Sequence, residues 1–191
     1  QYYSLYVYYT RNSVIDSNFI MCNGATNYSI YHYYANNNKV RYNTIKTIST
    51  GSAYPLYLGY NTNCTVTYNT IDSVQASTFY GIYSKHSANT NINYNTITRN
   101  NTTSTSYYIY AYYGDGNVSY IGNTIADNIS SSTQYMIYAY YGGNNTFTNN
   151  RIVNSMNNST SATYGAYIYC SANNVFDSNI ISDLSGSGTV S

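Results

Sequence analysis

Apolar and polar residues alternate along this chain in short groups of four to six positions, separated by polar turns. Around Tyr6, for example, Leu5 and Val7 flank the ring, and a polar segment follows over residues 10–13. A period of two is typical of a β-strand, whereas an amphipathic helix would space its apolar residues three or four positions apart. The pattern therefore predicts an all-β protein built from short strands.

The groups recur at a nearly constant interval. The tripeptide Asn-Thr-Ile, or a close variant, begins at Asn18, Asn43, Asn69, Asn95, Asn123, Asn150 and Asn179. The intervals are 25, 26, 26, 28, 27 and 29 residues. An isoleucine follows each asparagine by two positions, and an apolar or aromatic residue precedes each by three. Self-similarity of this kind indicates a repeat protein.

A second column, occupied by tyrosine in every repeat, keeps step with the first. Its members are Tyr6, Tyr31, Tyr57, Tyr83, Tyr110, Tyr138 and Tyr167. Counted from five residues before each tyrosine, one domain over 1–191 divides into coils at about 1–25, 26–51, 52–77, 78–104, 105–132, 133–161 and 162–191. Each repeat holds about three short strands that cannot bury a face alone, so we predict a parallel solenoid of seven coils of 25–30 residues.

The recurring asparagine predicts one corner of each coil. Asparagine tolerates the left-handed backbone conformation of a sharp bend. Its amide has donors and an acceptor, so stacked asparagines can bond to one another along the solenoid axis. The isoleucine two positions later is expected in the core, where full burial contributes about 1.5–3 kcal/mol. We therefore predict a ladder formed by the seven asparagines.

In its Gly-Ile-Tyr segment, Gly81–Tyr83, and its repeated Tyr-Asn-Thr-Ile segments, such as Tyr94–Ile97, the chain resembles the right-handed parallel β-helix repeats of the pectate-lyase-like superfamily. The resemblance covers essentially the whole chain and implies a right-handed parallel β-helix with an asparagine ladder. It implies no single activity, because that fold hosts lyases, hydrolases, tailspikes, adhesins and inert surface proteins.

Composition narrows the classes of function. Only 7% of the residues are charged and the net charge is +1, so no electrostatic footprint indicates nucleic acid or an anionic membrane. No apolar run reaches the roughly 18 residues of a membrane span. The abundance of Asn, Ser, Thr and Tyr is associated with extracellular proteins, and a chain that begins with Gln1 reads as a processed product or a fragment. Cys22, Cys64 and Cys170 fit no metal or disulfide pattern, and we expect them to be plain small residues.

The acidic residues do not predict a catalytic centre. Glycoside hydrolysis needs two carboxylates at one bond, and the six aspartates fall in different columns or distant coils, with Asp115 in a predicted loop. We expect no catalytic residue, no cofactor and no metal site, the lone His32 and His86 included. Three aspartates are expected to form cross-strand ion pairs on a solvated face, namely Asp16 with Arg41, Asp72 with Lys46, and Asp127 with Arg99.

The tyrosine column alternates with aliphatic residues, so its rings are expected to face outward and stack. Two positions later come Tyr8, Tyr33, Tyr112, Tyr140 and Tyr169, interrupted by Gly59 and Lys85. Together the two columns would form an aromatic strip larger than a monomer normally shows, suited to contact with a neighbouring subunit or with sugars. Two alternatives remain: the rings merely cover the sheet, or they face inward, since periodicity fixes alternation and not direction.

Asparagines that begin an Asn-X-Ser/Thr motif are candidates for N-glycosylation. They are Asn27, Asn63, Asn100, Asn101, Asn117, Asn128, Asn144, Asn157 and Asn158. Their number is close to chance for this composition. All lie outside the ladder, mostly in predicted loops from which a glycan could project.

Neither end of the sequence shows the polar capping repeat that solenoids normally carry. Two explanations fit: a fragment of a longer β-helix, or a last coil that pairs with the first coil of another molecule in an open head-to-tail homopolymer. We expect a secreted, non-enzymatic subunit of an extracellular filament, sheath or surface layer. The first alternative is an adhesin or polysaccharide-binding module whose tyrosines stack on sugars, and the next is a carbohydrate-active lyase or hydrolase.

Overall fold

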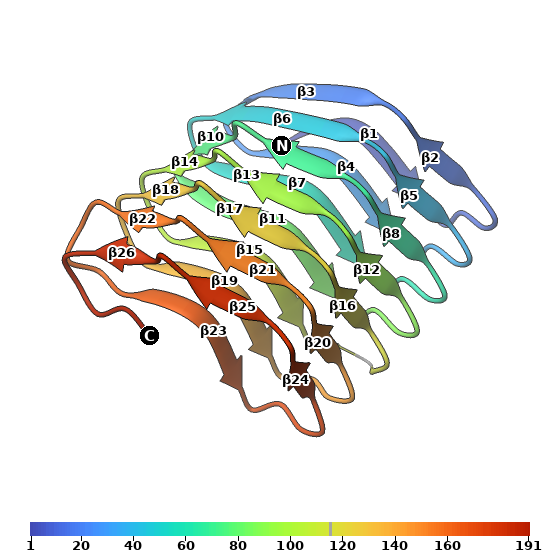
Figure 1. Cartoon of the computed structure of the whole chain (residues 1–191). Helices are drawn as coiled ribbons and strands as arrows, with labels where there is room; N and C mark the ends of the chain where they lie inside the picture. Colours follow the sequence, from blue (N-terminus) through green and yellow to red (C-terminus); the bar gives the residue numbers. More distant parts are fainter. Residues whose placement is uncertain (115) are drawn as a thin grey trace.

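The protein is a stack of short parallel strands wound around one core (Figure 1). The structure, a computed structural model, describes residues 1–114 and 116–191. Strands of successive coils lie side by side in chain order, from the N-terminal coil in blue to the C-terminal coil in red. The predicted all-β parallel solenoid of seven coils is thereby confirmed. Within the described ranges there is no helix that is long and apolar enough to span a membrane.

The first sheet contains the longest strands and carries the central tyrosines. Its order is β1 (Tyr2–Tyr8), β4 (Asn27–Tyr33), β7 (Ser52–Gly59), β11 (Thr78–Lys85), β15 (Ser106–Tyr112), β19 (Gln134–Tyr140) and β23 (Thr163–Tyr169). The parallel register pairs Tyr6 with Tyr31, and Tyr31 with Tyr57. Residues at the same position of successive repeats therefore lie next to one another along the solenoid axis.

Two further sheets complete each coil. The second sheet contains β2 (Val14–Asp16), β5 (Lys39–Arg41), β8 (Thr65–Thr67), β12 (Asn91–Asn93), β16 (Ser119–Ile121), β20 (Thr146–Thr148) and β24 (Val175–Asp177). The third contains β3 (Phe19–Gly24), β6 (Thr44–Ser49), β9 (Thr70–Asp72), β10 (Gln75–Ala76), β13 (Thr96–Thr98), β14 (Asn101–Thr102), β17 (Thr124–Ala126), β18 (Ile129–Ser130), β21 (Arg151–Val153), β22 (Met156–Asn157), β25 (Ile180–Ser182) and β26 (Ser185–Gly186). From the third coil onward a bend divides each long strand of this sheet into two.

The bend at each ladder corner is made by the residue before the ladder asparagine. Positive φ angles occur at Ser17, Tyr42, Tyr68, Tyr94, Gly122, Asn149 and Ser178. The prediction that the ladder asparagine itself adopts the left-handed conformation is therefore wrong. Its contribution is made by its side chain, which accepts and donates hydrogen bonds along the axis, while the preceding residue turns the chain.

The core consists of inward-facing columns that run the length of the solenoid. Ile45, Ile71 and Ile97, each two positions after a ladder asparagine, are fully buried. In the last coil this column loses its cover, so that Ile181 is 40% exposed, whereas Ile20 in the first coil is still only 8% exposed. The interior of the stack is thus closed by neighbouring coils, and the end coils present apolar side chains.

Each strand of the first sheet contains one break in alternation. In β4, Ser29 and Ile30 both face inward between the outward Tyr28 and Tyr31, and the register passes over Ser29. Pro55 occupies this position in β7, in keeping with the tolerance of proline where no ladder donor is needed. The break explains why tyrosines three positions apart lie on the same outer face.

Candidate functional site

The outer surface of the first sheet is covered by tyrosine rings, which we call the tyrosine face. It consists of three columns: Tyr3, Tyr28, Tyr54, Tyr80, Tyr107, Tyr135 and Tyr164; the seven central tyrosines Tyr6, Tyr31, Tyr57, Tyr83, Tyr110, Tyr138 and Tyr167; and Tyr8, Tyr33, Tyr112, Tyr140 and Tyr169. The central rings point outward because the residues on either side of them, such as Ile30 and His32 beside Tyr31, are buried. The column that begins at Tyr3 was not predicted, although the same repeat spacing marks it in the sequence.

Rings within a column pack against one another rather than standing free. The ring centroids of Tyr6 and Tyr31 lie 5.1 Å apart at an interplanar angle of 4°, and those of Tyr54 and Tyr80 lie 4.6 Å apart at 2°. Between Tyr57 and Tyr83 the arrangement changes to edge-to-face at 5.1 Å. Neighbouring rings therefore cover most ring faces, and Tyr57 is only 9% exposed. The surface presents ring edges and phenol hydroxyls, which makes stacking of sugars on this face unfavourable.

The two interruptions in the third column do not break the face. A side chain at Gly59 would collide with the ring of Tyr33, so the missing ring leaves no gap there. Lys85 places its Nζ 5.6 Å from the ring centroid of Tyr112, a cation–π geometry that contributes about 0.5–1 kcal/mol at an exposed site. The aromatic surface is therefore continuous across the seven coils.

Burial and crowding raise the pKa of several phenols of this face. Burial, followed by the charge of neighbouring phenols, raises the pKa of Tyr33 to about 12. The same causes raise the pKa of Tyr107 to about 12, and they raise the pKa of Tyr83 further. At neutral pH every such hydroxyl is an uncharged hydrogen-bond donor and acceptor.

A fourth column, here called the edge column, lies at the bend that follows the first sheet. It contains Tyr9, Tyr34, Tyr60, His86, Tyr113 and Tyr141, all with positive φ. The rings of Tyr9 and Tyr34 stack at 4.8 Å, and Tyr9 meets Tyr8 of the tyrosine face at 89°. Bulky residues rarely adopt this backbone conformation, which costs on the order of 1–3 kcal/mol. Stacking of the rings offsets part of that cost.

A separate stack of three tyrosines lies at the ladder corner. Tyr42, Tyr68 and Tyr94 stack at 5.2 and 5.3 Å and are each about half exposed. The stack ends on Gly122, whose Cα lies beneath the ring of Tyr94, so that an added Cβ would approach the ring to 2.5 Å. This corner stack is comparable in size to the first half of the edge column.

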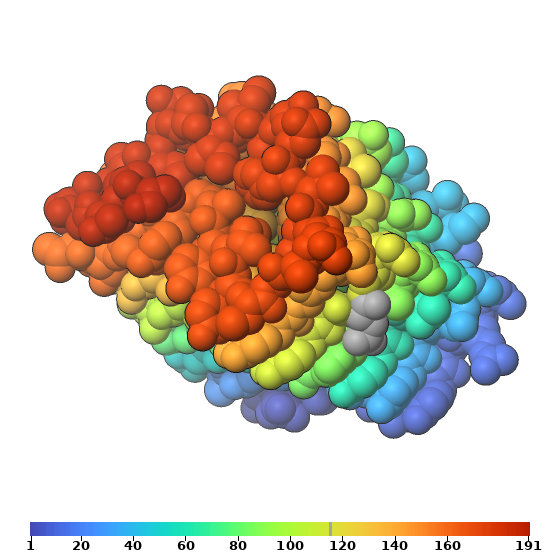
Figure 2. Space-filling view, turned by 90° about the horizontal axis from the view of Figure 1, so that it is seen from below, coloured from blue at the N-terminus to red at the C-terminus, as the bar shows by residue number. Residues whose placement is uncertain are grey.

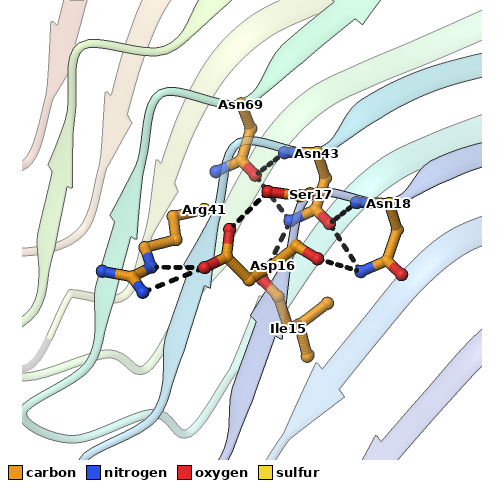
Figure 3. Close-up of polar contacts among 7 residues, drawn as sticks. All are labelled: Ile15, Asp16, Ser17, Asn18, Arg41, Asn43 and Asn69. Carbon is orange, nitrogen blue, oxygen red and sulfur yellow. Dashed lines mark hydrogen bonds and ion pairs between the residues drawn. The ribbon is translucent and has the colours of Figure 1, made fainter.

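The predicted asparagine ladder is complete. The Nδ2 atom of each ladder asparagine donates to the Oδ1 atom of the next, with distances between 2.9 and 3.1 Å from Asn18 to Asn179. Figure 3 shows the first links, in which Oδ1 of Asn43 also accepts from the backbone N–H of Asn18, and Nδ2 of Asn43 donates to the carbonyl of Ile15. Both donors and both lone pairs of an interior ladder amide are thus used.

A second, shorter asparagine ladder lies in the third sheet. Asn100 donates from Nδ2 to Oδ1 of Asn128 at 2.9 Å, and the backbone N–H of Val74 donates to Oδ1 of Asn100. Both asparagines are buried. The sequence shows asparagine here in only two coils, which is too few for the periodicity to reveal a ladder.

Two of the three predicted ion pairs are present. Arg41 contacts Asp16 at 2.9 Å (Figure 3), and Lys46 contacts Asp72 at 3.6 Å. Arg99 pairs with Asp72 at 2.6 Å instead of with Asp127, so the third prediction is wrong. The Asp72 side chain is only 6% exposed, and a buried carboxylate requires compensating charge. Hydrogen bonds from Arg99 hold the pKa of Asp72 below its ordinary value.

Four of the nine glycosylation candidates are buried, so their prediction as projecting sites is wrong. They are Asn27, Asn100, Asn128 and Asn157. Their buried side-chain amides form hydrogen bonds within the protein. Asn157, for instance, donates from Nδ2 to the carbonyl of Ser161 at 2.9 Å. The remaining five are exposed, namely Asn63, Asn101, Asn117, Asn144 and Asn158. These five stay candidates for modification.

The structure does not assemble a metal site from its described residues. Within 1–114 and 116–191 no three His, Cys, Asp or Glu side chains lie close enough to hold an ion. Asp16 in β2 and Asp177 in β24 stand at opposite ends of the second sheet, and Asp115 lies outside the described residues. His32 is buried beside Asn38, with Nε2 3.0 Å from Nδ2 of that asparagine. Cys22, Cys64 and Cys170 are free thiols.

Comparison with known proteins identifies the architecture and nothing more specific. Residues 1–125 match the family model described as a right handed beta helix region. No curated protein and no solved structure matched the chain. The right-handed β-helix that the resemblance implied is therefore confirmed by the family match.

Proposed function

Because the chain belongs to the right-handed β-helix family, we propose that it is a rigid, non-enzymatic subunit of an extracellular filament, sheath or surface layer. The observation that carries the proposal is the tyrosine face, a continuous surface of ring edges and hydroxyls along all seven coils. Tyrosine is enriched at protein interfaces because one side chain supplies both apolar area and a polar tip. In this proposal the face makes the lateral contacts between neighbouring solenoids.

Rigidity supports the same proposal. Every coil is tied to the next by parallel strand pairing in three sheets and by the asparagine ladder. The fixed spacing and the saturated amides leave little freedom for bending or for the opening of a cleft. A stiff rod suits a load-bearing subunit better than a protein that must close around a substrate.

Axial growth of the assembly would use the end coils. Leu5 and Val7 in the first coil are only partly buried against the core, and Phe176 and Ile181 in the last coil are 42% and 40% exposed, although all four belong to inward columns. In the proposed assembly these apolar side chains are covered by a further coil, supplied by a second copy in a head-to-tail contact. Such a contact is heterologous and continues without closing.

Electron microscopy of the native, undenatured protein tests the proposal directly. Filaments with an axial repeat near seven strand spacings, roughly 34 Å, are expected. Discrete, unconnected particles over a wide range of protein concentration would contradict head-to-tail assembly.

A double substitution in the first coil provides the matched test. Leu5→Lys combined with Val7→Lys places two charges at inward, partly buried positions of β1 in the first coil. We expect filaments to disappear while the β-rich circular dichroism spectrum remains. Assembly that survives both substitutions would show that the first coil is not the contact.

The family fold also hosts enzymes, and a direct assay addresses this third possibility. The protein should not cleave a panel of plant and bacterial glycans in the presence of calcium. Cleavage that is abolished by a single substitution, such as Asp72→Asn, would overturn the non-enzymatic part of the proposal.

A further inference from the structure

The three tyrosines of the corner stack occupy positions where the fold itself requires only a small side chain. Each holds a positive φ angle at the bend before a ladder asparagine. In the other four coils the same bend is made by short side chains or glycine, at Ser17, Gly122, Asn149 and Ser178. Bulky residues in this backbone conformation are uncommon, and strained residues are concentrated at functional sites. The corner stack is therefore a candidate for a function beyond the fold.

The rings of the corner stack lie nearly parallel at matching positions of successive coils. The ring centroids of Tyr42 and Tyr68 lie 5.2 Å apart at an interplanar angle of 7°, and those of Tyr68 and Tyr94 lie 5.3 Å apart at 11°. Figure 2 shows the coils as adjacent bands of colour, so that equivalent residues of neighbouring coils adjoin one another. Because the rings project from equivalent backbone positions, each hydroxyl and the two ring carbons beside it lie next to the same atoms of the neighbouring ring.

The rings of the corner stack are open to solvent and separate from the other tyrosine columns. Tyr42 is 52% exposed, and Tyr68 and Tyr94 are each 49% exposed. Over residues 1–114 and 116–191, the ring contacts of the corner stack run only between its own three members. In the edge column, by contrast, Tyr34 also contacts Tyr33 of the tyrosine face at 4.6 Å. An unpaired electron formed on the corner stack is thus confined to three rings, whereas one formed on the edge column can spread into the tyrosine face.

We propose that the corner stack is a site of oxidative cross-linking, at which Tyr68 is joined to Tyr42 or to Tyr94 as dityrosine. The oxidant is hydrogen peroxide, used by a haem peroxidase that removes one electron and one proton from each of two neighbouring phenols. The two phenoxyl radicals form a carbon–carbon bond between ring carbons ortho to the oxygens, and the hydrogen on each bonded carbon then moves through solvent to restore the hydroxyl. In total the protein loses two hydrogen atoms, and one peroxide is reduced to two molecules of water.

The cross-link would tie adjacent coils together beside the asparagine ladder. Along the chain, 26 residues separate Tyr42 from Tyr68 and Tyr68 from Tyr94. A covalent bond that closes a loop of this length stabilises a fold mainly by restricting the unfolded chain. Both tyrosines belong to one chain, so the inference does not depend on the filament proposal.

Treatment of the dilute native chain with a haem peroxidase and hydrogen peroxide tests the chemistry. Dityrosine is detected by its fluorescence, the loss of two hydrogen atoms by the intact mass of the monomer, and the joined residues by mass spectrometry of proteolytic peptides. We expect the main cross-linked peptides of the monomer to join Tyr68 to Tyr42 or to Tyr94. A monomer without dityrosine, or one whose main cross-links join tyrosines of the edge column or the tyrosine face, would overturn the proposal.

A pair of matched variants locates the site. Tyr68→Phe keeps the central ring of the corner stack and removes the hydroxyl that both cross-links require. The control is Tyr34→Phe, because Tyr34 also has a positive φ angle and is stacked between two tyrosines of its own column. We expect Tyr68→Phe to lose most of the dityrosine fluorescence of the oxidised monomer and Tyr34→Phe to retain most of it. Equal losses in the two variants would contradict coupling at the corner stack.

The two outer rings of the stack provide a second test that leaves Tyr68 unchanged. Tyr42→Phe should restrict the corner cross-link to Tyr68 and Tyr94, and Tyr94→Phe should restrict it to Tyr42 and Tyr68. The oxidised monomer should also unfold at a higher urea concentration than the untreated monomer, a gain that oxidised Tyr68→Phe should lack. Corner cross-links absent from both outer variants while each keeps its circular dichroism spectrum, or an equal gain in oxidised Tyr68→Phe, would contradict the proposal.

Discussion

The interior ladder amides are the residues on which the fold depends most directly. Asn95 is 1% exposed. Its Oδ1 accepts from the backbone and side chain of Asn69, and its Nδ2 donates to Oδ1 of Asn123 at 3.1 Å and to the carbonyl of Val66 at 2.9 Å. Each contact alone contributes on the order of 1 kcal/mol, whereas a buried polar group left without its partner costs more.

Asn95→Asp should therefore destabilise the protein by a few kcal/mol. The carboxylate cannot donate to Asn123 or Val66, and it places a desolvated charge in the ladder. Urea unfolding followed by circular dichroism measures the change. Asn37→Asp, at an exposed position, is the control and should cost less than about 0.5 kcal/mol. Similar losses of unfolding free energy in the two variants would show that the ladder hydrogen bonds of Asn95 do not contribute to stability.

Protonation of the buried His32 is expected to lower the stability at mildly acidic pH. Burial lowers the pKa of His32 to about 4, although the nearby side chain of Asn61 opposes the shift. Because the folded-state pKa lies below the unfolded value of about 6.5, the unfolded chain binds the proton first. Stability is thus fully present above about pH 6.5 and falls as the pH drops toward 4, by up to about 3 kcal/mol.

Replacement of His32 removes this dependence. Its partner in the next coil is Leu58, so His32→Leu introduces a residue that the column already accommodates. The free energy of unfolding, measured between about pH 7 and 4.5, should fall less steeply in His32→Leu than in the parent protein. Parallel slopes would assign the acid sensitivity to other groups.

At the scale of the element, the inward break in each strand of the first sheet determines how much volume a coil can hold. Consecutive coils compensate for one another in side-chain size. In β11 a large Phe79 is followed by Gly81, whereas at the matching positions of β15 a small Ser106 is followed by Tyr108. The rings of Phe79 and Tyr108 meet at 5.3 Å, and Tyr108 donates to Oε1 of Gln134 at 3.1 Å. The large aromatic residue thus fits only because its neighbour at the break has no side chain.

Gly81→Ala should consequently destabilise the protein by about 1–3 kcal/mol, the usual cost of overpacking. The added Cβ would lie 2.5 Å from the carbonyl oxygen of Tyr108, which is backbone and cannot move aside. At Gly114 the nearest atom is the side-chain Nδ2 of Asn145 at 3.2 Å. Gly114→Ala is therefore the control, with a small expected change. Thermal unfolding of both variants checks the prediction, which an unchanged midpoint in Gly81→Ala would contradict.

At the scale of the whole molecule, the tyrosine face makes the solenoid sensitive to alkali. The pKa values of Tyr33 and Tyr107 are about 12, and burial raises those of Tyr57 and Tyr110 as well. An unfolded tyrosine loses its proton near pH 10. The unfolded state is therefore favoured progressively as the pH rises above about 10.

The free energy of unfolding should decline between about pH 9.5 and 11.5, and ionisation of the phenols should accompany unfolding. Denaturant titrations across this range, with the ultraviolet absorbance of phenolate as a second probe, measure both quantities. Phenols that ionise near pH 10 in a protein that stays folded would show that the rings are not packed against one another as described.

The sequence by itself determined the repeat length, the strand columns, the ladder asparagines and the parallel solenoid. It could do so because a solenoid places residues one repeat apart in adjacent coils, so periodicity along the chain becomes contact in space. The Asp16–Arg41 pair followed from the same rule.

Only the tertiary structure decided which side of a strand faces the core, which residue turns each corner, and where a long side chain finds its partner. Because Ser29 and Ile30 both face inward, the outward residues around them, Tyr28 and Tyr31, are three positions apart and not two. Tyr42, rather than Asn43, adopts the left-handed conformation at the corner. Arg99 pairs with Asp72 in the preceding coil. The burial of Asn100 and Asn128 likewise depends on the position of the bend in the third sheet. These features depend on the angle through which the chain turns between columns, and equal spacing in the sequence leaves that angle open.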